Sequence, residues 1–394
     1  MEHLNELRVL QIGKYYPPHR GGMETHLEAL CEDLKRYVEV EIVVAASGER
    51  RTSHQLLDDV RLTRVGTLFN LKSAPFCPRM VHAIYKSRAD IVHIHLPNPG
   101  AILAYLASGH RGRLVLTYHS DIVRQKVLSR VFEPFLQRAL HLADAIIVSS
   151  PNYVETSNVL LKHREKCRVI PFGIKLDSFQ SPDTVEVAKL RELYGPRMVL
   201  GVGRLVYYKG FNHLIRAAKY FDGHVVIVGC GPLYDALREE AKSCGVSERV
   251  SLLTNVRDVR PYYHAADVFA LSSVARSEAF GIVQLEAMAC GKPVVNTELD
   301  TGVTYVSRSG DTGLTVPPAN DEALGQAINA LLNDPARAAS YGQAGQRRVL
   351  REFNLPVMTS RILQLYGEVM GATLAEPIPL ASPVLMMKAS EQIR

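Results

Sequence analysis

Short apolar runs alternate with longer segments of helical spacing along most of the chain. In the first half, the runs that are rich in Val, Ile and Leu cover residues 7–13, 38–46, 90–95, 114–119, 145–150 and 168–174. Strands buried on both faces of a parallel sheet have this composition, and the helical segments between them provide the crossover connections. The first half is therefore predicted to be a doubly wound α/β domain.

The same alternation restarts in the second half. Its apolar runs cover residues 198–203, 224–229, 250–253, 268–272, 293–296 and 313–316. Between the halves, Pro171 and Gly173 break the last strand, and a charged, turn-rich stretch follows. The pattern predicts an α/β chain of two doubly wound domains, over 1–175 and 196–355, joined by a linker over 176–195.

The end of the chain differs from both halves. A helix over 356–371 is expected to return to the first domain, and the proline-containing stretch 372–394 is interpreted as a loosely held terminus. In doubly wound sheets, ligands bind beyond the carboxyl ends of the strands, where glycine turns lead into helices. The candidate chemistry is therefore sought in those turns.

Composition agrees with a two-domain globular protein. The chain has 394 residues, of which 47% are hydrophobic and 22% charged. No run of 18 or more apolar residues is present, and the first residues lack the architecture of a signal peptide, so a cytoplasmic location is expected. Six scattered cysteines without a C-x-x-C pair favour reduced thiols over a disulfide framework or a zinc site.

The net charge of +6 lies entirely in the first half, because residues 172–394 are neutral overall. A basic half can attract a nucleic acid, anionic lipid headgroups or a phosphorylated acceptor. Scattered surface lysines and arginines explain the same count, so the charge alone does not choose among these partners.

Two glycine- or cation-bearing turns are candidates for binding phosphate. Gly21 and Gly22 precede a helix that begins near Met23, where the backbone can approach a phosphate and the helix dipole favours its charge. Arg204 and Lys209 follow the first strand of the second domain, and are expected at its surface, where a diphosphate would lie. Each pair taken alone also fits a plain loop or two solvated cations.

A third segment carries two glutamates eight residues apart, Glu278 and Glu286. Glu278 is predicted in a loop, where it can accept hydrogen bonds from sugar hydroxyls, and Glu286 in the following helix, where it can accept from the two ribose hydroxyls. Burial of Glu286 among apolar neighbours is costly unless a group pairs with it. The backbone amides that can meet the phosphates belong to Ala279, Phe280, Gly281 and Ile282.

These elements together resemble family 4 of the retaining glycosyltransferases, which have the GT-B fold. The resemblance covers residues 7–370 and rests on the glycine pair, on G-R-L-V-Y-Y-K-G, on the Glu278–Glu286 segment with its A-M-A-C-G-K-P tail, and on R-V-I-P-F-G-I at the domain junction. It implies two Rossmann-like domains that face a central cleft, the first on the acceptor side and the second binding a nucleotide sugar.

The resemblance also assigns roles to individual residues. It implies that Arg204 and Lys209 bind the donor diphosphate, that Glu286 holds the ribose, and that Glu278 contacts hydroxyls of the transferred sugar. Gly22, next to Gly21, matches the glycine of the phosphate-contacting loop, and Val256 lies where the family has its base-contacting loop. His119, in L-T-Y-H-S-D-I, matches a histidine beside the sugar, although a hydrogen-bonded histidine at a strand end is the alternative. The predicted catalytic residues are His119, Arg204, Lys209 and Glu278.

Several positions depart from the family pattern or carry weaker motifs. Lys175 stands where many relatives have an acidic residue, and Arg276 and Ser277 replace residues that bear on the choice of sugar. G-C-G-P at 229–232 is only half of a dinucleotide fingerprint. H-I-H at 93–95 places two imidazoles on one face of a strand, but without a third ligand it favours packing over metal binding.

The resemblance implies a reaction without a metal ion or other cofactor, in which the cations and helix N-termini neutralise the departing diphosphate. The expected enzyme is a hexosyltransferase that uses a UDP- or GDP-sugar and a glycan or lipid-linked acceptor in polysaccharide biosynthesis, with no nucleic-acid partner. A nucleotide-sugar 2-epimerase or hydrolase on the same fold is one alternative, and it lacks a recognisable acid/base set. A non-catalytic sugar-nucleotide-binding subunit is the other.

The segment 121–140 bears on the acceptor. Four cations, Arg124, Lys126, Arg130 and Arg138, are interspersed with apolar residues at helical spacing, and Pro134 interrupts the segment. A basic, apolar helix can lie at an anionic membrane surface, at the cytoplasmic face of the inner membrane for this chain. An ordinary amphipathic helix that covers the sheet is the alternative.

Overall fold

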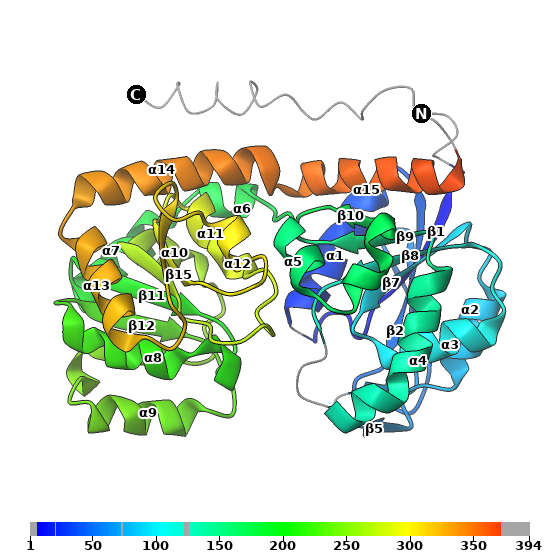
Figure 1. The fold of residues 1–394 in the computed structure, drawn as a ribbon, viewed down its shortest axis with the longest axis horizontal. Coiled ribbons are helices and arrows are strands. Elements are labelled where there is room, and N and C mark those ends of the chain that lie inside the picture. The colour runs from blue at the N-terminus through cyan, green and yellow to red at the C-terminus, as the bar shows by residue number, and fades with distance from the viewer. Residues whose placement is uncertain (1–5, 20, 72–73, 122–125, 372–394) are drawn as a thin grey trace. The chain divides into compact units, whose positions relative to one another are not determined.

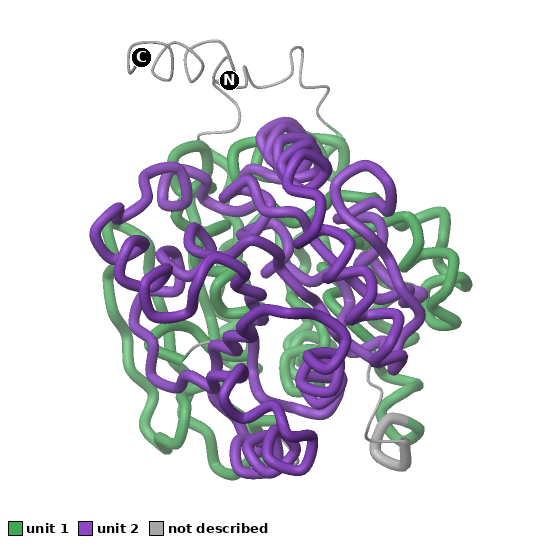
Figure 2. Tube along the Cα trace, turned by 90° about the vertical axis from the view of Figure 1, so that its left-hand side faces the viewer, with its two compact units in different colours: residues 1–173, 355–394 green, residues 174–354 purple. Residues whose placement is uncertain are grey.

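The computed structural model describes residues 6–19, 21–71, 74–121 and 126–371. The chain divides into two compact units, coloured separately in Figure 2: residues 1–173 with 355–394 form unit 1, and residues 174–354 form unit 2. In each unit, helices cover both faces of a central sheet (Figure 1). The doubly wound α/β prediction is confirmed for both halves of the chain.

Unit 1 is built on an eight-stranded sheet in the order β10-β9-β8-β7-β1-β2-β4-β3. Neighbouring strands are parallel except for β3 and β4. A separate antiparallel hairpin joins β5 and β6. The strands are β1 (Arg8–Ile12), β2 (Glu39–Ala45), β3 (Ser53–Leu57), β4 (Val60–Val65), β5 (Phe69–Leu71), β6 (Ala74–Phe76), β7 (Ile91–Leu96), β8 (Arg113–Tyr118), β9 (Ala145–Val148) and β10 (Cys167–Val169).

The helices of unit 1 lie between the parallel strands, and one of them comes from the far end of the chain. Helix α15 packs against α1, and within it Tyr366 is fully buried. The helices are α1 (Gly22–Leu34), α2 (Arg79–Lys86), α3 (Pro99–Ser108), α4 (Lys126–Leu142), α5 (Pro151–Thr156), the 3₁₀ segment η1 (Leu160–Lys166) and α15 (Leu355–Met370). The predicted loose terminus, 372–394, lies outside the described residues.

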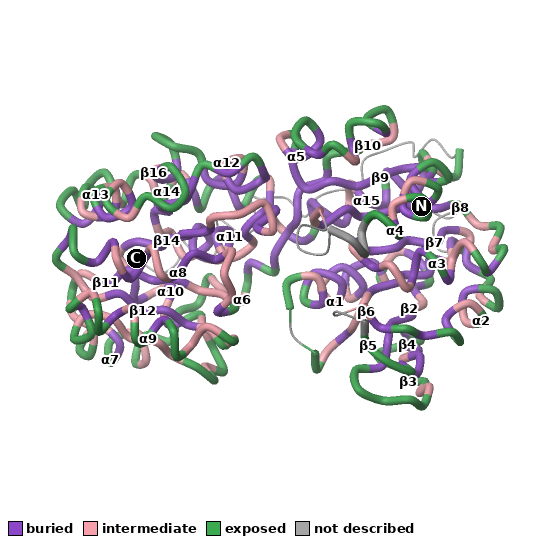
Figure 3. The backbone as a smooth tube through the Cα atoms, turned by 60° about the horizontal axis from the view of Figure 1, so that its bottom comes forward, coloured by how far each residue is buried: buried purple, intermediate pink, exposed green. Residues whose placement is uncertain are grey.

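The apolar runs of the sequence become the central strands because these are buried on both faces. β7 and β9 are buried at every position, as the continuous purple of their tubes in Figure 3 indicates. The sequence pattern did not reveal β3, at the edge of the sheet, or β4 beside it. β3 is polar and mostly exposed, and β4 carries Arg61 and Arg64 among its apolar residues. An edge strand needs less apolar surface, so its composition resembles that of a loop.

Unit 2 contains a six-stranded, wholly parallel sheet in the order β13-β12-β11-β14-β15-β16. The chain moves outward from β11 in one direction and then returns to add β14 on the other side. The loops after β11 and β14 therefore leave the sheet toward opposite sides, and this reversal is where doubly wound sheets bind ligands. The strands are β11 (Met198–Val202), β12 (His224–Val228), β13 (Val250–Leu253), β14 (Val268–Leu271), β15 (Val294–Thr297) and β16 (Gly313–Val316).

The helices of unit 2 enclose an apolar core of Val, Leu, Ile and Phe side chains from the strands and from α8 and α13. They are α6 (Asp177–Gln180), α7 (Thr184–Tyr194), η2 (Tyr207–Lys209), α8 (Phe211–Ala217), η3 (Ala218–Tyr220), α9 (Tyr234–Ser243), η4 (Ser247–Arg249), α10 (Arg260–Ala265), α11 (Ile282–Ala289), α12 (Val303–Val306), α13 (Asp321–Leu332) and α14 (Pro335–Glu352). Among the described residues, no helix has both the length and the apolar content needed to cross a membrane.

The prediction of a linker over 176–195 is wrong. This segment forms α6 and α7, which belong to unit 2, and α7 packs against α10. Arg191 bonds Asp267 at 2.9 Å, and Leu190 is buried. The sequence suggested a linker here because α7 carries four charged residues and buries only one apolar side chain, Leu190.

Replacing Leu190 tests whether α7 contributes to the stability of unit 2. Leu190→Ala should lower the free energy of unfolding by about 2–5 kcal/mol, because a buried leucine is lost and a cavity remains. The matched control is Leu193→Ala on the same helix, where the side chain is 69% exposed, and this variant should unfold like the parent chain. Urea denaturation followed by circular dichroism measures both. Equal, negligible effects would contradict the packing of α7.

Candidate functional site

The loops after β11 and β14 are joined by a buried ion pair between Lys209 and Glu278. The distance from Lys209 Nζ to Glu278 Oε2 is 2.6 Å, and the hydroxyl of Ser273 donates to the same oxygen at 2.9 Å. Lys209 is 9% exposed and Glu278 7%. The two residues that the sequence predicted as diphosphate and sugar contacts therefore touch each other at the topological switch point.

Glycines allow these loops to approach so closely. Gly210 follows Lys209 in the left-handed region, at φ +62°, and a Cβ there would lie 2.1 Å from the carbonyl oxygen of Ser272. Gly203 has φ +153°, and its Cβ would lie 3.0 Å from Cε of Lys209. Any other residue at either position would push the loops apart or displace the lysine. The hydroxyl of Ser272 also donates to the carbonyl of Lys209 at 2.9 Å.

The electrostatics of Lys209 follow from this pairing. Burial lowers the pKa of the ammonium, but the neighbouring Glu278 carboxylate outweighs this effect, so the pKa of Lys209 is raised above its ordinary value. The lysine is charged at neutral pH although it is almost inaccessible. The expectation that Lys209 lies at the surface is wrong for this reason, whereas Arg204 is exposed as expected.

Glu286 lies in the second turn of α11 and is half-buried. Its Oε2 accepts a hydrogen bond from the hydroxyl of Tyr263 at 2.5 Å. Burial raises the pKa of Glu286, although the Tyr263 bond and the charge of Lys209 oppose the change. Tyr263 is the partner that the sequence analysis required for this carboxylate but did not identify. It lies on α10, and no local spacing relates the two residues.

The start of α11 is held in place from behind. Gly281 precedes the helix at φ +74°, and no side chain caps it. Gln284 donates to the carbonyl of Phe280 at 3.2 Å and accepts from Asn296 Nδ2 at 2.9 Å. The first amides of a helix have no intrahelical acceptor, and the dipole makes this end positive. Ala279, Phe280 and Gly281 lead into this helix, and Ile282 is its first residue, so the amides that the sequence proposed for phosphate binding lie at the helix N-terminus.

Two further sequence signals in unit 2 have structural explanations. Val256 is half-buried in the loop after β13, at the same edge of the sheet but two strands away from β11. In the G-C-G-P motif, a Cβ on Gly229 would lie 1.9 Å from the carbonyl oxygen of Gly203, and one on Gly231 2.5 Å from that of Leu205. These glycines therefore allow close packing of neighbouring loops, in agreement with the rejection of a dinucleotide fingerprint.

Unit 1 carries the other predicted residues. Gly21 is extended and precedes α1, whose first residue is Gly22. A Cβ on Gly21 would lie 2.3 Å from Oε2 of Glu24, whereas one on Gly22 would meet no atom of the structure within 4 Å. Packing within the described chain therefore does not require glycine at position 22.

His119 follows β8 and is buried, with its ring stacked on Phe172 at a centroid distance of 4.9 Å. Its Nε2 lies 3.1 Å from Nδ1 of His95. Burial is the main cause that keeps the pKa of His119 well below its ordinary value, and repulsion from His26 and His93, were they protonated, acts in the same direction, so the imidazole is neutral at pH 7. The sequence analysis identified His119 but not its contact with His95.

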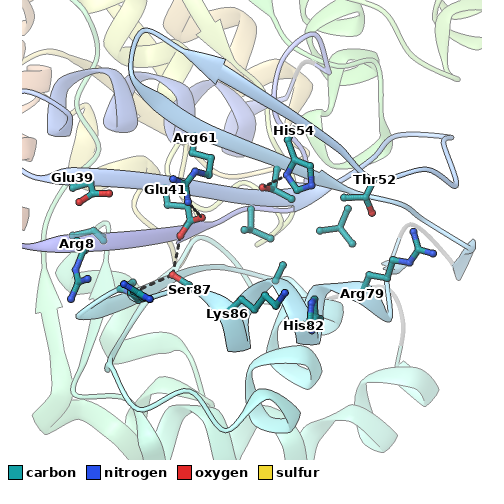
Figure 4. Close-up of a pocket in the computed structure, with 17 residues that line it drawn as sticks. Arg8, Glu39, Glu41, Thr52, His54, Arg61, Arg79, His82, Lys86 and Ser87 are labelled. Carbon is teal, nitrogen blue, oxygen red and sulfur yellow. Dashed lines mark hydrogen bonds and ion pairs between the residues drawn. The ribbon is translucent and has the colours of Figure 1, made fainter.

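A separate cavity of about 880 Å³ lies in unit 1 (Figure 4). Its walls come from β1, β2, β3, β4 and α2, and they include Arg61, Arg79 and Lys86 as well as Glu41. Ser87 donates to Glu41 Oε2 at 2.9 Å within it. No residue that the sequence predicted as functional lines this cavity.

Comparisons with known proteins identify the family. The model described as glycosyltransferase family 4 matches residues 20–178, and the one described as glycosyl transferases group 1 matches residues 184–348. The O-antigen chain mannosyltransferase C of Escherichia coli is 34% identical over 364 residues, which cover 91% of this chain and 98% of that protein. The D-rhamnosyltransferase WbpZ of Pseudomonas aeruginosa is 39% identical over 68% of this chain and 70% of its own length.

Solved structures agree on the fold. A sucrose-phosphate synthase from Thermosynechococcus elongatus aligns over 93% of this chain and 100% of its own, with a TM-score of 0.79 at 24% identity. HepE of Anabaena, solved in complex with UDP-glucose, aligns over 92% of this chain and 100% of its own, with a TM-score of 0.76 at 21% identity. The two Rossmann-like units thus define a GT-B glycosyltransferase. The chain belongs to glycosyltransferase family 4.

The raised pKa of Glu286 predicts a stability cost in the absence of ligand. A raised folded-state pKa means that the carboxyl group stabilises the fold fully only below its unfolded value, near 4.5, and loses that contribution as pH rises. Glu286→Gln keeps an acceptor for Tyr263 without the charge. The variant should therefore have a higher free energy of unfolding than the parent at pH 7, with a difference that shrinks toward pH 4.5.

Urea denaturation across this pH range measures the effect. The matched control is Glu239→Gln on α9, where the carboxylate is exposed and pairs with Lys242 at 3.4 Å. Exposed pairs of this kind contribute little, so the control should follow the parent at every pH. If Glu286→Gln is less stable than the parent at pH 7, the ionised carboxylate of Glu286 does not destabilise the ligand-free fold, and the prediction is wrong.

Proposed function

We propose that this chain transfers a mannose-type hexose from a GDP-linked donor to a lipid-linked glycan in surface-polysaccharide biosynthesis, with retention of anomeric configuration and without a metal ion. The observation that carries the proposal is the Lys209–Glu278 pair, at the carboxyl ends of β11 and β14 in a chain of a glycosyltransferase family. Two relatives support the sugar through their names, the mannosyltransferase and the D-rhamnosyltransferase. A third, from Mycolicibacterium smegmatis, is named as GDP-mannose-dependent.

The donor diphosphate would meet three sources of positive charge. The ammonium of Lys209 has three N–H donors, of which the bond to Glu278 uses one, so two remain for phosphate oxygens. Arg204 is exposed after β11 and can fork onto two oxygens. The N-terminal amides of α11 add the helix dipole. These groups can hold a diphosphate without a divalent cation.

The two glutamates would contact the two ends of the donor. Lys209 and Ser273 both bind Oε2 of Glu278, so its Oε1 can accept hydrogen bonds from hydroxyls of the transferred sugar. Glu286, whose Oε2 accepts from Tyr263, can accept from the ribose hydroxyls. Charge-assisted bonds of this kind are strong, and ribose binding would repay the cost of burying Glu286.

The reaction breaks the bond between the anomeric carbon and the phosphate oxygen. Negative charge then grows on the diphosphate, where Lys209, Arg204 and the start of α11 stabilise it more strongly in the transition state than in the ground state. The acceptor hydroxyl forms the new bond on the face from which the phosphate departs, and its proton passes to the departing phosphate oxygen. Atoms and charge balance without a protein nucleophile, so the sugar retains its configuration.

Arg204→Ala tests the diphosphate contact most cleanly, because Arg204 is exposed whereas Lys209→Ala would leave Glu278 buried and unpaired. Turnover with saturating GDP-mannose should fall by about two to three powers of ten, as expected on loss of a charge partner of the transition state. The matched control is Arg238→Ala, which removes an exposed cation from α9 and should leave turnover unchanged. Near-parental turnover of Arg204→Ala would remove this residue from the reaction.

The same assay in excess EDTA tests the metal-free mechanism. Turnover of the parent chain should persist, because the protein's own cations neutralise the leaving group. A complete loss that manganese or magnesium restores would contradict this. Product analysis with a labelled donor also separates the alternatives, since transfer gives a new glycoside, whereas an epimerase or hydrolase gives an altered or free sugar and a binding subunit gives none.

The identity of the base and sugar is tested by thermal shift with GDP, UDP, ADP and their sugars. A ligand present at 100 times its dissociation constant stabilises the folded chain by about 2.7 kcal/mol, so the correct nucleotide should raise the unfolding temperature clearly. GDP and GDP-mannose should give the largest shifts. Glu286→Gln should reduce both shifts, because the ribose is common to the two ligands. A response to UDP alone would overturn the choice of GDP.

Helix α4 supports a lipid-linked acceptor. Val131 and Phe135 are 67% and 45% exposed, and Leu142 lies on the same helical face at 41% exposure. Arg138 falls within this exposed face, while the neighbouring face that carries Phe132 and Leu136 is buried. Arg124 and the side chain of Lys126 lie outside the part of the chain that the structure describes. An exposed apolar face that carries a cation suits peripheral association with an anionic membrane at its cytoplasmic face.

Co-sedimentation with liposomes tests this association. The chain should pellet with anionic vesicles and not with neutral ones at low salt, because each surface cation contributes about 1 kcal/mol. The double variant Val131→Glu, Phe135→Glu should lose pelleting. The matched control, Val185→Glu with Leu193→Glu, places the same charges on exposed apolar positions of α7 and should pellet like the parent. Equal, negligible pelleting of the parent with both vesicles would favour an acceptor in solution.

A further inference from the structure

Three buried histidines of unit 1 converge on one point. His26 comes from α1, His95 from the end of β7, and His119 from the turn after β8. One nitrogen of each ring lies within 4.8 Å of one nitrogen of each of the others. The ring centroids are 5.1 to 5.7 Å apart, so the imidazoles form a nearly equilateral triangle. The H-I-H motif supplied one ligand to this group, and the tertiary structure supplies the other two.

His26 has no partner of its own. It is 5% exposed, and neither Nδ1 nor Nε2 has a hydrogen-bond partner among the described residues. A buried polar group without a partner costs about 1–3 kcal/mol, and such groups are rare in native structures. The ring is packed against Phe172 at a centroid distance of 4.5 Å and forms edge-type contacts with the rings of His95 and His119. The position is costly unless a further group binds there.

The hydrogen bonds around His95 already resemble the outer shell of a metal site. Nε2 of His95 lies 2.9 Å from Oε1 of Gln11, an acceptor, so this nitrogen carries the proton. Its Nδ1 therefore has a free lone pair, which faces Nε2 of His119 at 3.1 Å. Two nitrogens on a tetrahedral zinc ion are about 3.3 Å apart, given zinc–nitrogen distances near 2.0–2.1 Å. Ligating histidines typically donate their other N–H to such an oxygen.

The chemistry of the three ligand side chains indicates which class of metal ion would bind. Three imidazoles without a carboxylate suit zinc and neighbouring transition metals, whereas magnesium and calcium require oxygen ligands. Burial lowers the pKa of all three imidazoles, that of His26 to about 4, so their lone pairs are available at neutral pH without loss of a proton. His119 needs only to carry its proton on Nδ1 in place of Nε2.

We propose that His26, His95 and His119 bind one transition-metal dication, for which Zn²⁺ is the best match, with Gln11 orienting His95 from the outer shell. The site has three protein ligands and thus leaves the fourth tetrahedral position to water. Because the ion would occupy His119, zinc should inhibit sugar transfer. This consequence rests on the proposed function, in which His119 serves the reaction, while zinc binding itself does not.

Direct binding measurements test the site. The untagged full chain, stripped with EDTA and freed of it by gel filtration, is titrated with Zn²⁺ against a chromophoric chelator and, separately, with Co²⁺. One tightly bound zinc per chain and the intense visible absorption of tetrahedral cobalt are expected. His26→Gln should weaken zinc binding more than about a hundredfold, and Gln11→Ala by about 10–100-fold, the usual effect of losing an outer-shell partner.

The matched control is His264→Gln, because His264 Nε2 lies 3.5 Å from Cys290 Sγ and forms a rival pair of zinc ligands in unit 2. This variant should bind zinc like the parent. Absence of stoichiometric zinc or of the tetrahedral cobalt spectrum in the parent chain would overturn the proposal, whether or not the variants fold. Parental affinity in His26→Gln, or loss of binding in His264→Gln, would also overturn it.

The transfer assay tests inhibition by zinc separately from the binding of zinc. Added zinc should inhibit the parent enzyme in the transfer assay, EDTA should restore turnover, and His26→Gln should require more zinc for inhibition. Stoichiometric binding without inhibition would support the metal site and contradict the role of His119 in transfer. Transfer without any zinc binding would overturn the metal site and leave the proposed function intact.

Discussion

The buried contact between Lys209 and Glu278 is the constraint on which the candidate donor site depends. Two oppositely charged groups, each less than a tenth exposed, are held at 2.6 Å where the loops after β11 and β14 meet. Removing either partner would leave a buried charge uncompensated, which typically costs about 3–5 kcal/mol. The loop that carries Arg204 and the loop that leads into α11 are therefore positioned by the same pair that is proposed to bind the donor.

A buried ion pair is weak evidence for a stabilising role, because well-packed apolar residues often stabilise a fold equally well. The location of this pair in the sheet favours a role in ligand binding. The strand order reverses between β11 and β14, so the two loops diverge and their polar side chains can face a ligand. Glu286 is a similar case. Burial raises the pKa of its carboxyl group, and one hydrogen bond from Tyr263 only partly offsets the free-energy cost of burying the carboxylate. Both features are costs to the free protein that a bound nucleotide sugar could offset.

Unit 1 shows a second kind of buried polar group. His93, His95, Gln11 and Tyr366 are joined by hydrogen bonds of 2.6 to 2.9 Å, and each side-chain nitrogen or oxygen of these four residues has a hydrogen-bond partner. The two ring nitrogens of His26 have none among the described residues, although His26 lies against the same cluster. Both nitrogens of His93 are used in hydrogen bonds to hydroxyl groups, whereas His26 has no partner and Nδ1 of His95 contacts only the imidazole of His119. This difference is the reason for assigning a metal ion to His26, His95 and His119 and none to His93.

Much of this protein followed from the sequence alone. Continuous apolar runs located the central strands of both sheets, because strands buried on both faces need apolar residues at every position. The glycine, cation and glutamate motifs selected Gly22, Arg204, Lys209, Glu278 and Glu286 as candidate site residues, because the resemblance to family 4 is carried by short segments. The local pattern did not reveal elements whose residues are mostly exposed and therefore polar. Examples are the edge strand β3 and helix α7, which was predicted to be part of a linker.

Only the tertiary structure decided which distant residues meet. Tyr263 and Glu286 are 23 residues apart, and His26 is 93 residues from His119. Contacts at such separations depend on strand order and on how helices pack over the sheet, and no periodicity in the chain encodes them. For the same reason, the sequence did not determine which residues are buried. Lysine is usually a surface residue, yet the carboxylate of Glu278 in the neighbouring loop allows Lys209 to be buried while charged. Sequence determined the elements and the residue types, and packing determined their partners.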